Sequence, residues 1–136
     1  MSILLVLVDF GQNRELVMDP LSPKIAVQYI EKAIVVTLNE EKILEEMEIQ
    51  ALEDIIMPLI SAGKPTKLVI DFSNVKFLSS AVLGLLIRIS KKIYESNGQL
   101  RLCCIERNIS KIFKITRLDK VFDIFEDQSE AIDSLI

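Results

Sequence analysis

The 136 residues are enough for one domain, and half of them are hydrophobic, so the chain can build a core of useful size. With 16 Lys and Arg against 20 Asp and Glu, its formal charge is -4, so it lacks the basic field that attracts nucleic acid or anionic lipid. The absence of histidine excludes hydrolase triads that use one and removes the commonest metal ligand. We therefore predict no catalytic residue, no metal site, no cofactor, and binding to neither nucleic acid nor membranes.

Residues 1–23 are predicted to add an extra strand and a connection to the main domain. Residues 1–8 are apolar but lack the positive n-region and the cleavage site of an export signal, which favours a strand. Turn and breaker residues at 11–14 and 19–23 predict a connection or a hairpin. Because no apolar run approaches the ~18 residues of a membrane span, we expect a soluble domain.

Residues 24–136 are predicted to form one α/β domain in which strands alternate with helices. The expected elements in chain order are strands at 25–29 and 33–38, a helix with an apolar face from Ile49 to Ile60, a strand at 68–72, a helix beginning near Ser80, a strand at 100–105, a helix capped by Asn108, a strand at 121–125 and a helix at 127–136. Pro58 should shorten or kink the first helix. Alternating strands and helices need crossover connections, so we expect a mixed, largely parallel sheet with helices packed on it.

The two cysteines, Cys103 and Cys104, are adjacent in an apolar run that we interpret as a strand. Neighbouring side chains of a strand point to opposite faces, so these two cannot easily form a disulfide. We interpret them as buried thiols, which suits a reducing cytoplasm.

Two serines stand where the central strand gives way to the next helix. Ser79 or Ser80 can cap that helix by accepting a hydrogen bond from one of its free N-H groups. The apolar residues that follow form one broad helical face, namely Val82, Leu83, Leu85, Leu86, Ile89 and Ile93. Ser80, Gly84 and Arg88 recur on the opposite stripe, so the pattern predicts that Ser80 faces outward.

The segments Asp71-Phe-Ser-Asn-Val75 and Phe77-Leu-Ser-Ser-Ala-Val-Leu-Gly84 resemble the motif of STAS domains, the fold of the bacterial anti-sigma-factor antagonists. In that family a strand ending in Asp-Leu-Ser-x-Val leads through an aromatic residue to Asp-Ser-Ser-Gly-Leu-Gly. A protein kinase phosphorylates the serine directly after the aspartate of this motif. The resemblance extends from about Lys24 to the C-terminus, where it is supported by the order of the elements.

Residue by residue, the resemblance places Ser80 at the phosphorylated serine, Ala81 at the second serine and Gly84 at the second glycine of the motif. Two positions depart from the pattern, because Ser79 stands for the aspartate and Val82 for the first glycine. These departures bear on regulation by phosphorylation more than on the fold.

The resemblance implies a cytoplasmic regulator of transcription that acts by binding proteins. The unmodified domain would dock on an anti-sigma factor that is a serine kinase of the histidine-kinase-like ATPase type, and a sigma factor would be released. Phosphorylation of Ser80 would end the association, and a serine phosphatase would reset it. The expected partner surface comprises Ser79, Ser80, Ala81, Gly84 and Arg88. The alternative is a constitutive STAS scaffold subunit of a signalling complex without phospho-switching, and a small-molecule-binding STAS domain is a third possibility, for which the sequence offers no recognisable pocket.

Each candidate residue also has a plainer interpretation. Both serines could be N-caps only, and Gly84 could accommodate a neighbouring loop. Asp71 could organise the turn with Ser73 and Asn74. The glutamates between residues 40 and 48 are typical of a solvated helix start, and the basic residues near Arg88 are typical of a solvated helix face.

Overall fold

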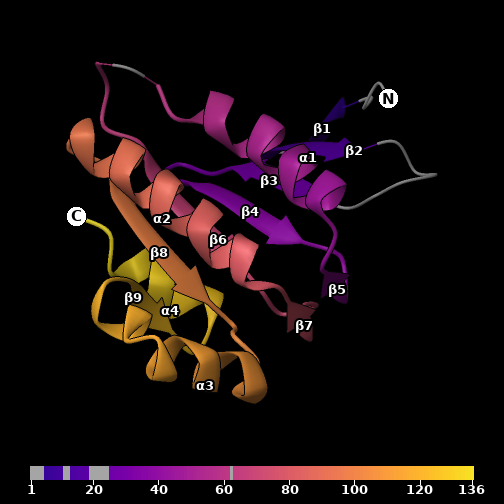
Figure 1. Ribbon diagram of the computed structural model, residues 1–136. Coiled ribbons are helices and arrows are strands. Elements are labelled where there is room, and N and C mark those ends of the chain that lie inside the picture. Colours follow the sequence, from indigo (N-terminus) through magenta and orange to yellow (C-terminus); the bar gives the residue numbers. More distant parts are fainter. Residues whose placement is uncertain (1–4, 11–12, 19–24, 62) are drawn as a thin grey trace.

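The computed structural model describes residues 5–10, 13–18, 25–61 and 63–136 (Figure 1). Seven strands form one sheet in the order β1-β2-β3-β4-β6-β8-β9, with bounds β1 Leu5–Phe10, β2 Asn13–Met18, β3 Ile25–Tyr29, β4 Ile34–Leu38, β6 Lys67–Asp71, β8 Gln99–Cys103 and β9 Asp123–Phe125. Two short strands, β5 Lys42–Ile43 and β7 Phe77–Leu78, pair separately. The helices are α1 Glu46–Ile56, α2 Ser80–Glu95, α3 Arg107–Ile115 and α4 Gln128–Asp133.

The sheet is mixed, as the alternation of strands and helices predicted. Strands β1 to β4 pair antiparallel, whereas β4, β6, β8 and β9 pair parallel. The parallel strands are joined by crossovers that contain helices α1, α2 and α3. Because parallel strands end at the same edge, the C-terminal residues of β6 and β8 lie side by side.

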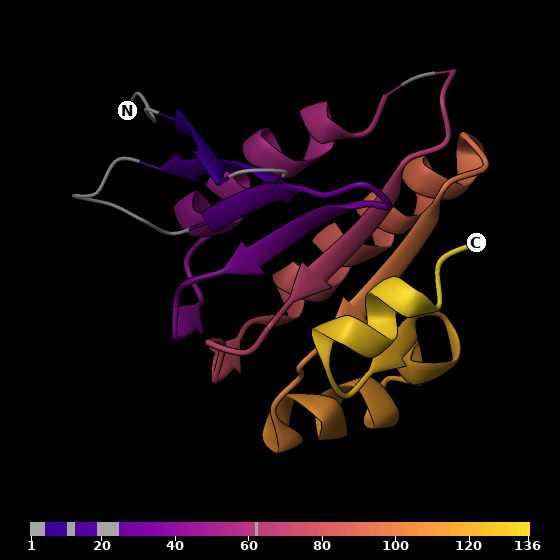
Figure 2. The same cartoon turned by 180° about the vertical axis from the view of Figure 1, so that it is seen from behind.

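Helices cover both faces of the sheet. Helices α1 and α2 lie on one face (Figure 1), and α4 lies on the other (Figure 2). Consecutive residues of the central strands point to opposite sides, so Ile70 packs in the larger core with α1 and α2. Val69 packs in a smaller core with Ala131 of α4 and with Leu135, which follows that helix. Both Val69 and Ile70 are fully buried, which is typical of strands covered on two faces.

Two expectations about helix ends had different outcomes. The shortening at Pro58 is confirmed, because α1 ends at Ile56 and a single 3-10 turn, Met57–Leu59, follows. The cap at Asn108 is wrong. The carboxylate of Glu106 instead accepts a hydrogen bond from the backbone N-H of Asn108 at 3.0 Å, and the helix begins at Arg107, two residues earlier than a cap at Asn108 requires.

The N-terminal segment forms a pair of strands, one of the two alternatives that its sequence pattern indicated. The predicted first strand corresponds to β1, although residues 1–4 lie outside the described part of the chain. The segment predicted as a connection or a hairpin contains β2, which pairs antiparallel with both β1 and β3, so the hairpin alternative is confirmed. Of the predicted turn residues, 11–12 and 19–23 also lie outside the described part. None of the described helices has the length and apolar character needed to cross a membrane.

Gly98 leads from α2 into β8 at a point where another backbone passes very close. A Cβ atom built on Gly98 would lie 2.3 Å from the carbonyl oxygen and 2.9 Å from the nitrogen of Thr66. We expect Gly98→Ala to lower the free energy of unfolding by about 1 to 3 kcal/mol, because backbone atoms cannot give way as a flexible side chain can. Urea denaturation of the variant and the unmodified protein measures this difference.

Gly84 provides the matched control for Gly98→Ala. A Cβ atom at Gly84 would meet only the Nη1 atom of Arg88, at 3.7 Å, so Gly84→Ala should stabilise helix α2 by about 0.5 to 1 kcal/mol. Equal effects of the two substitutions would contradict the close approach at Gly98.

Candidate functional site

Ser79 and Ser80 lie where the short strand β7 leads into helix α2. Ser79 is the N-cap residue of α2 and Ser80 is its first helical residue. The backbone N-H of Ser79 donates a hydrogen bond to the carbonyl oxygen of Ile43 at 3.0 Å. The pairing of β5 with β7 therefore fixes the start of α2 beside the segment that leads into α1.

The two serine hydroxyls have different environments. Ser80 is exposed, as the helical pattern predicted. The Oγ atom of Ser79 is buried and has no hydrogen-bond partner among the described residues. Ser79 has the extended backbone of an N-cap, but its predicted side-chain cap is wrong, because the N-H of Val82 donates to the backbone oxygen of Ser79 at 3.0 Å. Of these two serines, Ser80 is therefore the one that is accessible at the surface.

The stripe that continues from Ser80 along α2 holds Gly84 and Arg88. The Nε atom of exposed Arg88 donates to Oε1 of Glu53 in α1 at 2.9 Å, so the guanidinium bridges the two helices. Gly84 does not accommodate a neighbouring loop, since a Cβ there would have open space except toward Arg88. The plainer interpretation of Gly84 is therefore wrong for the described part of the chain.

The segments around β5 and β7, from which α1 and α2 begin, lie at one end of the molecule (Figure 1) and carry three exposed apolar side chains. Leu44 is 49% exposed, Met47 72% and Phe77 52%, and we call them the apolar rim. Leu44 follows Ile43 directly, and Ile43 binds Ser79, so the rim adjoins the start of α2. These residues were not predicted from the sequence, although Leu44 and Met47 are apolar residues inside the acidic segment from Glu40 to Glu48.

Asp71 organises the turn after β6, as one interpretation of the sequence had it. Its Oδ1 atom accepts a hydrogen bond from the backbone N-H of Ser73 at 2.8 Å. Its Oδ2 atom accepts one from Nε2 of Gln128, at the start of α4, also at 2.8 Å. Asp71 therefore connects the end of β6 to the helix on the far face of the sheet.

The expectation that Cys103 and Cys104 point to opposite faces is wrong. Cys104 has a φ of 62°, in the left-handed region, which breaks the alternation of an extended strand. Both sulfur atoms lie within 4.8 Å of each other and of a carboxylate oxygen of Asp71. Burial and the negative charge of Asp71 raise the pKa of each thiol, so both thiols are protonated at neutral pH.

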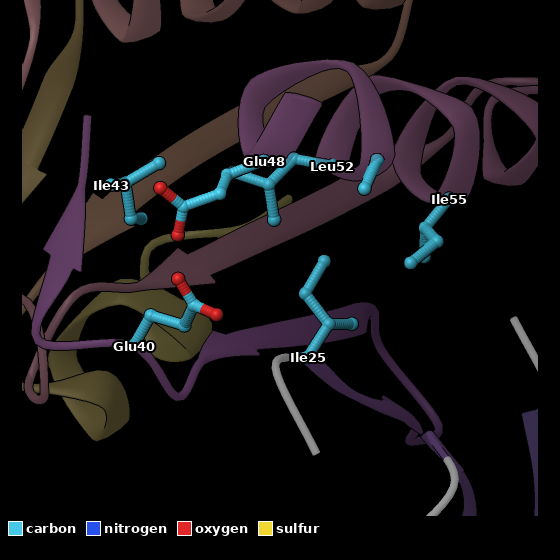
Figure 3. A pocket seen from close by; sticks show the side chains of 7 residues that line it. Ile25, Glu40, Ile43, Glu48, Leu52 and Ile55 are labelled. Atoms are coloured by element: carbon cyan, nitrogen blue, oxygen red, sulfur yellow. The ribbon is translucent and has the colours of Figure 1, made fainter. Parts of the chain in front are cut away.

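A small cavity lies between α1 and the segment around β5 (Figure 3). Its volume is about 20 Å³, which is room for one water molecule. Apart from Glu40 and Glu48, whose carboxylates point toward one another, its lining is apolar (Figure 3). A cavity of this size holds nothing larger than a water molecule.

The comparisons with known proteins agree with this geometry. The family model described as "STAS domain" matches residues 24–131. The chain belongs to the STAS domain family. Two solved STAS structures superpose well. One is an anti-sigma-factor antagonist domain protein from Planctomyces limnophilus, with a TM-score of 0.74, 23% identity, and coverage of 82% of this chain and 97% of that one. The other is an anti-sigma factor antagonist from Mycobacterium paratuberculosis, with a TM-score of 0.72, 26% identity, and coverage of 86% and 97%.

Among curated proteins, this STAS chain is similar to one from Thermotoga maritima that is provisionally named as an anti-sigma factor antagonist. The two are 28% identical over 69 residues, which is 51% of this chain and 61% of the relative. The match therefore spans less than two thirds of the relative's length. The similarity supports membership of the STAS family, but it does not show that this chain has the activity of the whole relative.

Proposed function

We propose that this STAS protein is an anti-sigma-factor antagonist, a binding module that docks on an anti-sigma serine kinase and is switched by phosphorylation of Ser80. The observation that carries the proposal is the contrast between the two hydroxyls at the start of α2. Ser80 is exposed in the first turn, whereas the Oγ atom of Ser79 is buried. A kinase can therefore phosphorylate Ser80 without disturbing the fold.

The surface around Ser80 has the composition of a docking site. The apolar rim supplies exposed Leu44, Met47 and Phe77, and large apolar side chains surrounded by polar residues mark interaction sites. The stripe of Gly84 and Arg88 extends this surface along α2. Since Gly84 has no side chain, a partner's backbone can approach the helix there.

Phosphorylation would change the charge of this surface without unfolding it. A phosphate carries about 1.5 to 2 negative charges at neutral pH, so the formal charge of the chain would fall from -4 to about -6. At Ser80 the phosphate meets the N-terminus of a 16-residue helix, whose dipole and free N-H groups stabilise an anion. The modified domain stays folded, while the buried contact with the partner is lost to repulsion and desolvation.

The alternative function is that of a constitutive STAS scaffold without a phospho-switch. The observation that favours it is the chemistry of the two departures from the family motif. Ser79 supplies no carboxylate beside Ser80, and Val82 is buried in the core where the motif has a glycine. The scaffold would use the same surface around Ser80 for permanent assembly.

Binding of the unmodified chain to the kinase tests the proposed function. The anti-sigma serine kinases encoded in the same genome are titrated with the purified chain by calorimetry, with ATP or ADP present. The proposal expects one of them to bind and to transfer phosphate to the chain. A stable complex with a kinase-type partner but no transfer supports the scaffold, and no binding to any of them contradicts both functions.

The purified chain should also show no catalytic turnover. It lacks histidine, and the sequence contains no glycine-rich phosphate loop and no paired catalytic groups. Incubation with nucleotides and activated esters, followed by product analysis, measures this. Sustained hydrolysis that copurifies with the chain and disappears in Asp71→Asn or Ser80→Ala would contradict it.

A further inference from the structure

The ends of β6 and β8 bring a carboxylate and two thiols together on the face that α4 covers. Asp71 and Cys103 are register partners in the parallel pair, so their side chains leave the same face of the sheet. Asp71 is 6% exposed and Cys103 fully buried. This cluster lies on the opposite face of the sheet from α2 (Figures 1 and 2).

The third group joins the cluster through an unusual backbone conformation. Cys104 has a φ of 62°, a region that non-glycine residues rarely occupy. Its backbone N-H donates to the carbonyl oxygen of Phe125 at 3.2 Å, which holds this conformation against the edge strand β9. The two sulfur atoms and one carboxylate oxygen then all lie within 4.8 Å of one another.

The carboxylate in this cluster has only neutral partners. The hydrogen bonds to Asp71 come from the backbone N-H of Ser73 and the amide of Gln128, and among the described residues no Lys or Arg forms an ion pair with it. A buried carboxylate favours a positive charge nearby. The Cys104 thiol also forms a hydrogen bond with Asp71, so the carboxylate and this thiol already contact one another.

We propose that Asp71, Cys103 and Cys104 form a binding site for a soft divalent metal ion of the zinc type. Binding of Zn²⁺ would displace the proton of each thiol to solvent. The resulting two thiolates and one carboxylate are ligands that Zn²⁺ accepts, and thiolates select it over Mg²⁺ or Ca²⁺. Two sulfur atoms at ~2.3 Å from a tetrahedral Zn²⁺ are about 3.8 Å apart, so small side-chain rotations close the cluster on the ion. A water molecule completes the tetrahedron, and the Gln128 amide orients Asp71 as an outer partner.

Titration of the reduced, metal-free protein with Cd²⁺ and Zn²⁺ tests this site. Cd²⁺ should produce a thiolate-to-metal charge-transfer absorption that saturates at one ion per chain, and Zn²⁺ should displace it and raise the Tm. Cys104→Ser should abolish the absorption change, and Asp71→Asn should weaken Cd²⁺ binding by at least about tenfold. Asp133→Asn removes an exposed carboxylate from α4 and should bind Cd²⁺ as the unmodified protein does.

Two results would overturn the proposal. One is the absence of a saturable absorption in the unmodified protein. The other is a Cys104→Ser or Asp71→Asn variant that folds, as judged by circular dichroism, and keeps the original Cd²⁺ affinity. Neither result depends on the partner, so this site and the docking function are tested separately.

Discussion

Ser80→Asp should bind the anti-sigma kinase at least about 30-fold more weakly than the unmodified chain, a loss of ~2 kcal/mol, because an unpaired charge enters the interface. The carboxylate places a permanent negative charge at the exposed first residue of α2, where the phosphate would stand. Ser80→Ala should bind nearly as well as the unmodified chain, because it adds no charge. Calorimetric titration of the kinase with each variant gives the three affinities.

Ser129 provides the control for Ser80→Asp. It is exposed in α4, on the other face of the sheet, so Ser129→Asp adds the same charge far from the proposed surface. Its affinity for the kinase should not change. The Tm of Ser80→Asp should not fall, since an acidic group in the first turn of a helix is favourable. Equal losses of affinity for Ser80→Asp and Ser129→Asp would contradict a docking surface at α2.

Leu86→Ala should lower the free energy of unfolding by about 2 to 5 kcal/mol, because the substitution leaves a cavity in a packed core. The Leu86 side chain is 3% exposed and belongs to the larger core between the sheet and α2. Its neighbour Ile87 is 46% exposed on the same helix, so Ile87→Ala should change stability by about 0.5 kcal/mol or less. Denaturation by urea measures both variants, and similar values for the two would reject the assigned buried face.

The buried faces of the elements could be predicted because the spacing of apolar residues along a helix or strand shows which face is buried. Leu83, Leu86 and Ile89 recur at helical spacing, and all three are buried in α2. The same period placed Ser80 on the exposed stripe, where the structure has it. A periodic pattern identifies a face reliably because every residue of the element contributes to it.

Features that depend on a single backbone angle or on distant pairing could not be predicted in this way. An apolar run of residues does not indicate that Cys104 has a left-handed φ. The proximity of its thiol to Cys103 and Asp71 was therefore not predicted. The buried Oγ atom of Ser79 depends on the hydrogen bond between Ser79 and Ile43, residues far apart in sequence. Strand β2 is stabilised by pairing with β3, and its own residues show no strong alternation.

The apolar rim was missed for a related reason. Leu44 and Met47 lie in an acidic segment, and Phe77 stands between polar and apolar neighbours. Each alone is an ordinary surface residue. Only the pairing of β5 with β7 places the segments that carry them at the same end of the molecule.

Mapping the phosphate after incubation with the cognate kinase tests the central claim most directly. The chain is treated with kinase and ATP, digested, and analysed by mass spectrometry, and the modified chain is then titrated against the kinase. We predict phosphate on Ser80 alone and loss of binding by the modified chain, which keeps its Tm. Phosphate only on Ser79 or on no residue, or a phosphorylated chain that binds as tightly as before, would contradict the switch.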